Sequence, residues 1–137
     1  MREILFRGKR LDNGEWVEGA FCPKDCDMPF GPMVDKPSII KLDDPCSGFW
    51  FEVDPNTVGQ FTGLLDKNGK RIFEGDVFAW GYAGVYDMRY VVSYDAVTTS
   101  FIGVRKHGFL SLSGITIEII GNIHDNPELL EGGKNDG

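Results

Sequence analysis

The amino-acid sequence predicts an all-β (mainly β) protein built from short strands and tight turns. Its 137 residues include 18 Gly and seven Pro, residue types that favour turns and interrupt helices. Apolar and polar side chains alternate along several segments, which is the two-residue period of a half-buried strand. Asn-Gly occurs at 13–14 and again at 68–69, and this dipeptide favours β-hairpin turns. The length accommodates one domain, or one small barrel with a smaller β subdomain.

Residues 1–56 are predicted to form an N-terminal β-hairpin and loop subdomain. Segments 4–6 and 16–21 flank Asn13-Gly14, so we expect them to pair through a type I′ turn. Four prolines between residues 22 and 37 remove amide donors that a sheet requires, and they predict a long loop. Short strands are expected at 38–42 and 49–53, before a turn or single helical turn at Pro55.

Residues 57–127 are predicted to form an SH3-like small barrel in the C-terminal half. Asp66 and Gly69 lie in a hairpin turn, and apolar side chains recur at every second position between 86 and 94. Isoleucines at 115, 117, 119 and 123 repeat this pattern, with residues 101–104 as another strand. About five short strands in so short a segment are typical of a small closed barrel.

Residues 128–137 are predicted to hold the end of a short helix and a disordered tail. Asn126 suits the N-cap position of that helix, and Pro127 suits its first helical position, where no amide donor is needed. The glycine-rich segment after residue 131 offers no apolar side chain for packing, so we expect it to be disordered.

The charge balance argues against polyanionic partners. The chain has 14 Lys and Arg against 21 Asp and Glu, which gives a net charge of −7 and repels nucleic-acid phosphates and anionic membranes. Its start shows no apolar leader, and no apolar run approaches the ~20 residues of a membrane span. We therefore expect a cytoplasmic protein with no membrane partner, for which nucleic acid is an unfavourable partner.

Three cysteines, Cys22, Cys26 and Cys46, are an odd number in a chain without a recognisable leader. This usage argues against a disulfide scaffold, so free thiols are expected. Together with His107 or His124 the cysteines would supply the ligands of a tetrahedral zinc site, but a second closely spaced cysteine pair is missing. We predict no metal and no other cofactor.

Catalytic motifs are not apparent in the sequence. Glu74 and Asp76 form a carboxylate pair of the kind that supports acid–base chemistry or Mg²⁺ binding. In a chain with 21 acidic residues, however, such pairs are expected from solubility alone. Neither a nucleophile elbow nor a phosphate-binding glycine loop occurs. A metal-dependent hydrolase is therefore the least favoured hypothesis, and we predict that the protein is not an enzyme.

Three consecutive aromatic residues, Phe49, Trp50 and Phe51, place rings on both faces of one predicted strand. One face can enter the core, while the other needs cover from the loop at 22–37, a second subunit or a ligand. We therefore predict a binding surface here for an unknown protein partner or a second copy of the chain. Further candidate binding residues are Gln60, Thr62, Glu74 and Asp76, whose alternative role is hydrogen bonding within turns.

Three segments of the sequence resemble the YopX family. They are MREILFR at 1–7, VDPNTVGQFTGLLDKNG at 53–69 with IFEGD at 72–76, and IIGNIHDNPELL at 119–130. Members of this family occur in phages, prophages and the bacterial genomes that carry them, so the resemblance implies the cytoplasm of a bacterial host. It also implies an SH3-type barrel in the C-terminal half and no catalytic residues.

Two functions from different classes follow for such a protein. The leading hypothesis is a phage or prophage accessory protein that binds a protein partner or self-assembles without catalysis. The alternative is a small β-barrel associated with nucleic acid, because small barrels bind strands on aromatic platforms with basic rims. Trp80, Tyr82, Tyr90 and Arg105 are the candidate platform.

Overall fold

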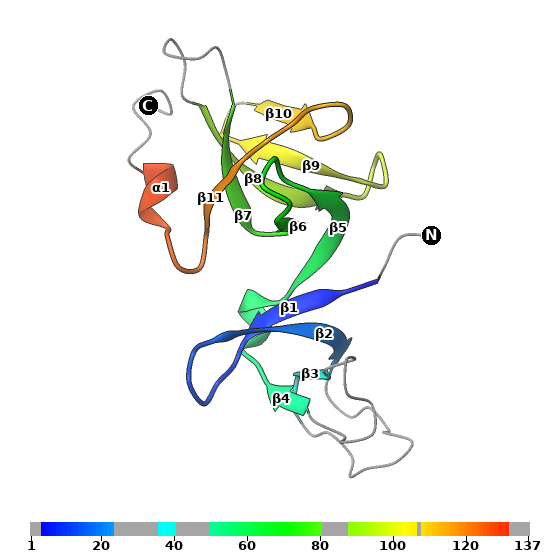
Figure 1. Cartoon of the computed structure of the whole chain (residues 1–137), viewed down its shortest axis with the longest axis vertical. Helices are drawn as coiled ribbons and strands as arrows, with labels where there is room; N and C mark the ends of the chain where they lie inside the picture. Colours follow the sequence, from blue (N-terminus) through cyan, green and yellow to red (C-terminus); the bar gives the residue numbers. More distant parts are fainter. Residues whose placement is uncertain (1–3, 24–35, 41–49, 81–87, 107, 132–137) are drawn as a thin grey trace. The chain divides into compact units, whose positions relative to one another are not determined.

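The mainly β class predicted from the sequence is confirmed by a computed structural model of the chain (Figure 1). The structure describes residues 4–23, 36–40, 50–80, 88–106 and 108–131. Within these ranges eleven strands form two antiparallel sheets, accompanied by one 3-10 helix and one short α-helix. The chain divides into two compact units, unit 1 from Met1 to Phe61 and unit 2 from Thr62 to Gly137. The division expected from the sequence lies five residues earlier, after residue 56.

Unit 1 is built on an antiparallel sheet. Its strands are β1 (Phe6–Lys9), β2 (Trp16–Cys22), β3 (Ser38–Ile40), β4 (Trp50–Glu52) and the start of β5 (Gly59–Leu65), with helix η1 (Pro55–Thr57) before β5. They are hydrogen-bonded in the order β4-β3-β2-β1-β5. An isolated bridge joins Arg10 to Val53. The Asp54 side chain accepts a hydrogen bond from the Asn56 amide, which begins the helical turn predicted at Pro55.

The predicted hairpin between β1 and β2 is confirmed, but its turn differs from the expected type. A type I′ turn needs two central residues with positive φ, and within the described residues of this loop only Gly14 has one, at 73°. The Gly14 amide instead donates to the Arg10 carbonyl, and the Arg10 amide donates to Glu15. The Asn13 side chain accepts from the Glu15 amide at 2.9 Å and stabilises this longer loop.

The core of unit 1 lies on one face of this sheet. Ile39 in β3 is paired with Phe21 in β2 and Phe51 in β4, so these three side chains share that face. Val17, Ile39 and Val53 form the buried cluster, with Phe51 packed against it. Trp50, one residue earlier in β4, is paired with Ile40 and belongs to the opposite face.

Unit 2 contains the second sheet and the C-terminal helix. Its further elements are β6 (Arg71–Phe73), β7 (Asp76–Trp80), β8 (Met88–Asp95), β9 (Ser100–Arg105), β10 (Gly108–Ser111), β11 (Ile119–Asn122) and α1 (Glu128–Glu131). Strand β6 neighbours β5, and the remaining strands follow the order β10-β9-β8-β7-β11. Neither sheet closes over the described residues, so this topology does not establish the predicted SH3-like barrel. Helix α1 matches the predicted short helix, whereas the predicted disordered tail lies outside the described residues.

The core of unit 2 lies on one face of the five-stranded sheet. Its buried residues are Ile72, Phe78, Tyr90, Val92, Phe101, Leu112 and Ile117. The rings of Phe78 and Tyr90 stack with their centroids 5.4 Å apart. Gly103 leaves room for this pair, because a Cβ at that position would lie 2.6 Å from Phe78 Cζ. The alternation predicted along β8 is thus confirmed. The strand pattern predicted from Ile115 to Ile123 is wrong at its start, because β11 begins at Ile119 and Ile117 is buried outside any strand.

Asp66 fixes the predicted turn between β5 and β6. Its Oδ1 accepts hydrogen bonds from the amides of Asn68 and Lys70, both at 2.9 Å. Its Oδ2 accepts from the amide of Ile119 at 3.2 Å, which ties the turn to the start of β11. Burial alone would raise the pKa of Asp66. The hydrogen bonds from the three amides together outweigh that effect, so the pKa lies below its ordinary value.

Candidate functional site

The binding residues predicted in the central segment are placed by the structure in strands and turns. Gln60 lies opposite Phe6 in the β1–β5 pair of unit 1. In unit 2, Thr62 is buried and its hydroxyl oxygen accepts from the Leu64 amide at 3.1 Å. Asp76 is 1% exposed, and its Oδ2 accepts from the Phe73 amide at 2.8 Å. These contacts are the turn-forming role weighed from the sequence, and a role in binding stays a prediction.

The turn between β6 and β7 connects three parts of unit 2. Gly75 has a φ of 89°, a conformation that residues with a side chain rarely adopt. Its amide donates to the Val92 carbonyl in β8, and its carbonyl accepts from the Ile123 amide after β11, both at 2.9 Å. Glu74, beside it, is half-buried. The Glu-Gly-Asp segment therefore has a clear structural role in holding β8 and the end of β11 beside the turn.

An open cleft in unit 1 surrounds the aromatic residues of β4. We call it the aromatic cleft; it has a volume of about 520 Å³ and is lined by Leu11, Asp12, Lys36, Trp50, Phe51 and Glu52. The Arg10 guanidinium lies over the Phe51 ring, 4.2 Å from its centroid. Phe51 is thus held between the core and a cation, whereas Trp50 lies on the face away from the core. Phe49 lies outside the described residues.

The rim of the aromatic cleft carries two ion pairs. Arg10 donates two hydrogen bonds to the Asp12 carboxylate, at 2.7 and 3.0 Å. The hydrogen bond from Arg10 holds the pKa of Asp12 below its ordinary value. Lys36 Nζ lies 3.8 Å from Glu52 Oε2 in an exposed pair. Paired charges around half-buried aromatic rings resemble the polar rim and apolar centre of protein–protein interfaces.

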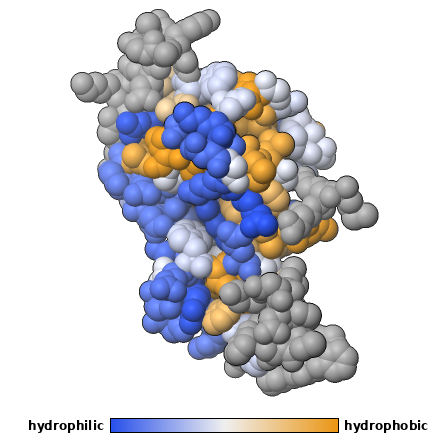
Figure 2. Space-filling model, in the orientation of Figure 1, coloured by the Kyte–Doolittle hydropathy of each residue, from blue (hydrophilic) through white to orange (hydrophobic). Residues whose placement is uncertain are grey.

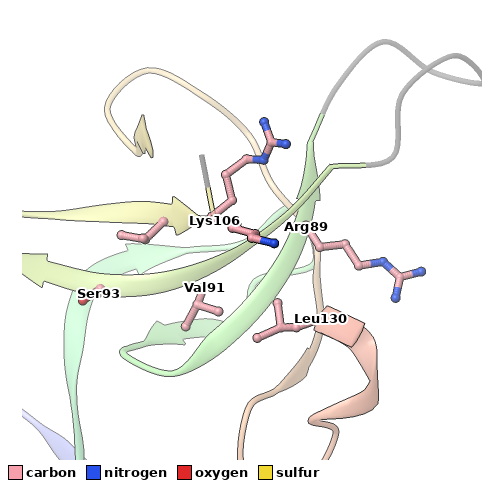
Figure 3. Close-up of a pocket in the computed structure, with 7 residues that line it drawn as sticks. Arg89, Val91, Ser93, Lys106 and Leu130 are labelled. Atoms are coloured by element: carbon pink, nitrogen blue, oxygen red, sulfur yellow. The ribbon is translucent and has the colours of Figure 1, made fainter. Parts of the chain in front are cut away.

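A second open site lies in unit 2, on the sheet face opposite the core. We call it the basic groove; it has a volume of about 490 Å³ and is lined by Arg89, Val91, Ser93, Val104, Arg105, Lys106 and Leu130. Figure 3 shows Arg89, Val91 and Ser93 following one another along β8, with Leu130 on α1. Val104 of β9 is paired with Val91, so their side chains share this face.

The basic groove combines cationic and aliphatic side chains. Arg89 Nη1 donates to the Leu129 carbonyl at 2.6 Å, which positions its guanidinium beside α1. Arg105 Nη1 lies 3.3 Å from Met88 Sδ, and Lys106 is exposed. No acidic side chain is present among the described residues that line the groove. Apolar residues also reach the surface elsewhere, between strongly hydrophilic ones (Figure 2), and the exposed ones include Val97, Phe109 and Ile120.

Sequence reasoning missed the basic groove. The sequence offers only a short cationic run at 105–107 and one arginine, Arg89, on the polar face of the strand predicted around Tyr90. One signal was present, because Val91 is an apolar residue on that otherwise polar face. The pairing of Val91 with Val104 and the approach of Leu130 depend on contacts between distant parts of the sequence.

The aromatic platform predicted for nucleic acid is wrong at Tyr90. Tyr90 is 7% exposed and stacks on Phe78 inside the core, so its ring is not accessible to a base. Trp80 packs against the same core, and Arg105 lines the basic groove. Tyr82 lies outside the described residues.

The expectation of free thiols is wrong for Cys22, which is disulfide-bonded. Its partner lies outside the described residues, as do Cys26, Cys46 and His107. A disulfide sulfur is not a thiolate, so in this state Cys22 cannot serve the zinc site considered from the sequence. Within the described ranges, no three His, Cys, Asp or Glu side chains cluster in a way that would hold a metal ion.

The matches to a protein family and to a solved structure each cover nearly the whole chain. Residues 6–131 match the family model described as YopX protein. Among solved structures, the chain is similar to the crystal structure of protein EF1440 from Enterococcus faecalis, with 25% sequence identity and a TM-score of 0.52. That similarity covers 95% of this chain and 99% of the other. No curated protein matches the chain. In the described part of the chain, no helix is long and apolar enough to span a membrane.

Proposed function

The chain belongs to the YopX family, and we propose that it is a phage- or prophage-encoded accessory protein that binds a protein partner without catalysing a reaction. The observation that carries this proposal is Trp50, which lies on the sheet face away from the core and lines the open aromatic cleft. The partner is a protein of the bacterial host cytoplasm or a second copy of the chain.

The chemistry of the aromatic cleft supports a protein partner. Tryptophan is among the residues that contribute most to protein interfaces, because its large ring buries much apolar area and its N–H can donate a hydrogen bond. Trp50 belongs to β4, which ends the strand order of the sheet in unit 1. The ion pairs of Arg10 with Asp12 and of Lys36 with Glu52 supply a polar rim.

We also propose that the strands of unit 2 have an SH3-like arrangement. The short antiparallel strands β7 to β10 and the turn at Asp66 support this proposal. Such an arrangement is compatible with many functions and does not by itself identify one.

Site-specific photo-crosslinking in bacterial cells tests the protein-binding proposal. A photoreactive phenylalanine analogue replaces Lys36 on the rim of the cleft or, as the matched control, Lys70 in the exposed β5–β6 turn of unit 2. We expect a discrete protein adduct from position 36 that is absent from position 70 and is lost on Trp50→Ser. Sedimentation velocity of the purified chain then shows whether the adduct is a self-dimer.

Three results would overturn the proposal. They are the same adducts from both positions, an adduct that survives Trp50→Ser, and a strict monomer that gives no adduct at position 36. Circular dichroism of Trp50→Ser shows whether the variant keeps its strand content, and Trp50→Phe, which retains an aromatic ring, should keep the adduct.

A further inference from the structure

The basic groove brings cationic and aliphatic side chains side by side on one face of the five-stranded sheet. Arg89, Val91 and Ser93 occupy alternate positions of β8 on the face away from the core. Val104 and Lys106 continue that face at the end of β9, and Leu130 approaches from α1. Three separate elements therefore converge on one site of unit 2, and this site is independent of the aromatic cleft that supports the proposed function.

The charge of the groove is opposite to that of the whole chain. Among the described residues that line it, Arg89 and Lys106 bring positive charge to the open face, and Arg105 follows Val104 with its guanidinium against Met88, in a chain whose net charge is −7. Arginine guanidinium groups bind carboxylates and phosphates through directed N–H donors, and lysine adds a mobile positive charge. A compact anion interacts mainly with these nearby cations, whereas a long polyanion also meets the acidic remainder of the chain.

The apolar part of the groove favours a ligand that has an aliphatic part. Val91, Val104 and Leu130 offer aliphatic surface beside the cations. No aromatic side chain occurs among the described residues that line the groove, so it provides no platform for stacking a nucleobase. A volume of about 490 Å³ is within the range of small-molecule sites.

We propose that the basic groove binds a small organic acid with an aliphatic body. Its carboxylate or phosphate group lies between Arg89 and Lys106, and its aliphatic part lies on Val91, Val104 and Leu130. Both parts are required, because the cations attract any small anion and the aliphatic surface attracts any apolar molecule. The two sources of the anionic group, carboxylate and phosphate, are separated by the experiment.

Titrations of the isotope-labelled full chain, followed by methyl NMR, test this proposal with defined probes. Octanoate and octyl phosphate represent the two anionic groups, acetate and inorganic phosphate lack the aliphatic body, and octyl glucoside lacks the charge. We expect saturable shifts at the methyl groups of Val91, Val104 and Leu130 with octanoate or octyl phosphate. The affinity should exceed that of the head-group-only and uncharged probes by about tenfold, and it should fall as salt is added.

Matched variants separate binding from folding. Val104 is 38% exposed, so Val104→Glu places a negative charge in the groove without disturbing the core, while Val104→Thr keeps the shape of the side chain. Of octanoate and octyl phosphate, one will bind more tightly to the parent chain. We expect Val104→Glu and Lys106→Gln to lower the affinity for that acid by about tenfold or more. Val104→Thr should stay within about threefold of the parent. Lys70→Gln, which removes a cation from an exposed turn of the same unit, should leave the affinity unchanged.

Several outcomes would overturn the proposal. These are the absence of saturable methyl shifts with both acids, equal binding of octyl glucoside, and equal losses in Lys106→Gln and Lys70→Gln. Tighter binding of a single-stranded oligothymidylate than of either acid at the same methyl groups would replace the proposal with a nucleic-acid surface. Because the aromatic cleft is not involved, these results leave the crosslinking test of the proposed function unaffected.

Discussion

The two faces of the five-stranded sheet in unit 2 use alternate residues of the same strands in different ways. On one face, Tyr90 and Val92 of β8 are buried against Phe78 of β7. On the other, Arg89 and Val91 of the same strand border the basic groove. Along β8, strand alternation therefore determines which residues enter the core. The chemistry of the open face depends instead on what neighbouring elements bring beside it.

The largest effect is expected on the core face. Phe78 is fully buried, so Phe78→Ala should lower the free energy of unfolding by about 4 kcal/mol, through lost apolar burial and a residual cavity. Val91→Ala on the open face should change it by less than about 1 kcal/mol, because Val91 is only partly buried. Urea denaturation followed by circular dichroism measures both. Equal losses would mean that the two faces are packed alike.

Residues 103 and 104 of β9 lie on opposite faces of the sheet, so an added methyl group should have different effects at the two positions. Gly103→Ala places a Cβ 2.6 Å from Phe78 Cζ and 3.1 Å from Tyr90 Cβ, so we expect a loss of about 2 kcal/mol from overpacking. The neighbouring Val104→Ile adds a methyl group on the open face and should stay within about 0.5 kcal/mol of the parent. Thermal unfolding of the two variants checks this difference. A harmless Gly103→Ala would show that the Phe78 ring can move aside.

A third prediction concerns pH and the buried carboxylate of Asp66. Because its pKa is lowered in the folded state, Asp66 stabilises the fold above its unfolded pKa of about 3.9, and that contribution is lost as pH falls through the lower folded value. At pH 7, Asp66→Asn should be less stable by about 1–2 kcal/mol, because an amide is a weaker acceptor than a carboxylate for the three N–H donors. The deficit should shrink in acid, as urea denaturation at pH 7 and pH 3 would show. An equal deficit at both pH values would contradict this prediction.

The smallest effect on stability is expected for the cations of the groove. Lys106→Gln should leave the free energy of unfolding within about 0.5 kcal/mol of the parent, because Lys106 is exposed at the end of β9. Chemical denaturation measures this change, with Lys70→Gln as the comparison. A loss above about 2 kcal/mol would mean that Lys106 stabilises the fold and that its position beside the groove has another explanation.

Short-range patterns predicted much of the fold. The alternation around Tyr90 and Val92 identified β8, Asp66 and Gly69 identified a turn, and Pro127 marked the start of the terminal helix. These features depend on residues that are close in the sequence. The first hairpin was also predicted, but its turn type was wrong because Gly14 alone has the positive φ in the loop that is described.

Features that depend on distant contacts were not predicted. Strand β10 has a weak pattern of its own and is formed by pairing with β9. Tyr90 was assigned to a binding platform, although the alternation that identified its strand also directs its ring into the core. The disulfide of Cys22 and the convergence of Val91, Val104 and Leu130 require parts of the chain that no short window of sequence relates.

Helix α1 spans four residues, which is too short for a helix to persist in water without tertiary support. Its support includes the bond from Arg89 to the Leu129 carbonyl and the close fit of Leu129 against Gly121, where a Cβ would lie 2.6 Å from Leu129 Cδ1. Since Leu130 is also a wall of the groove, shortening the chain at residue 128 would remove part of the site. Affinity tags and fluorescent labels for ligand studies are therefore better attached at the N-terminal end.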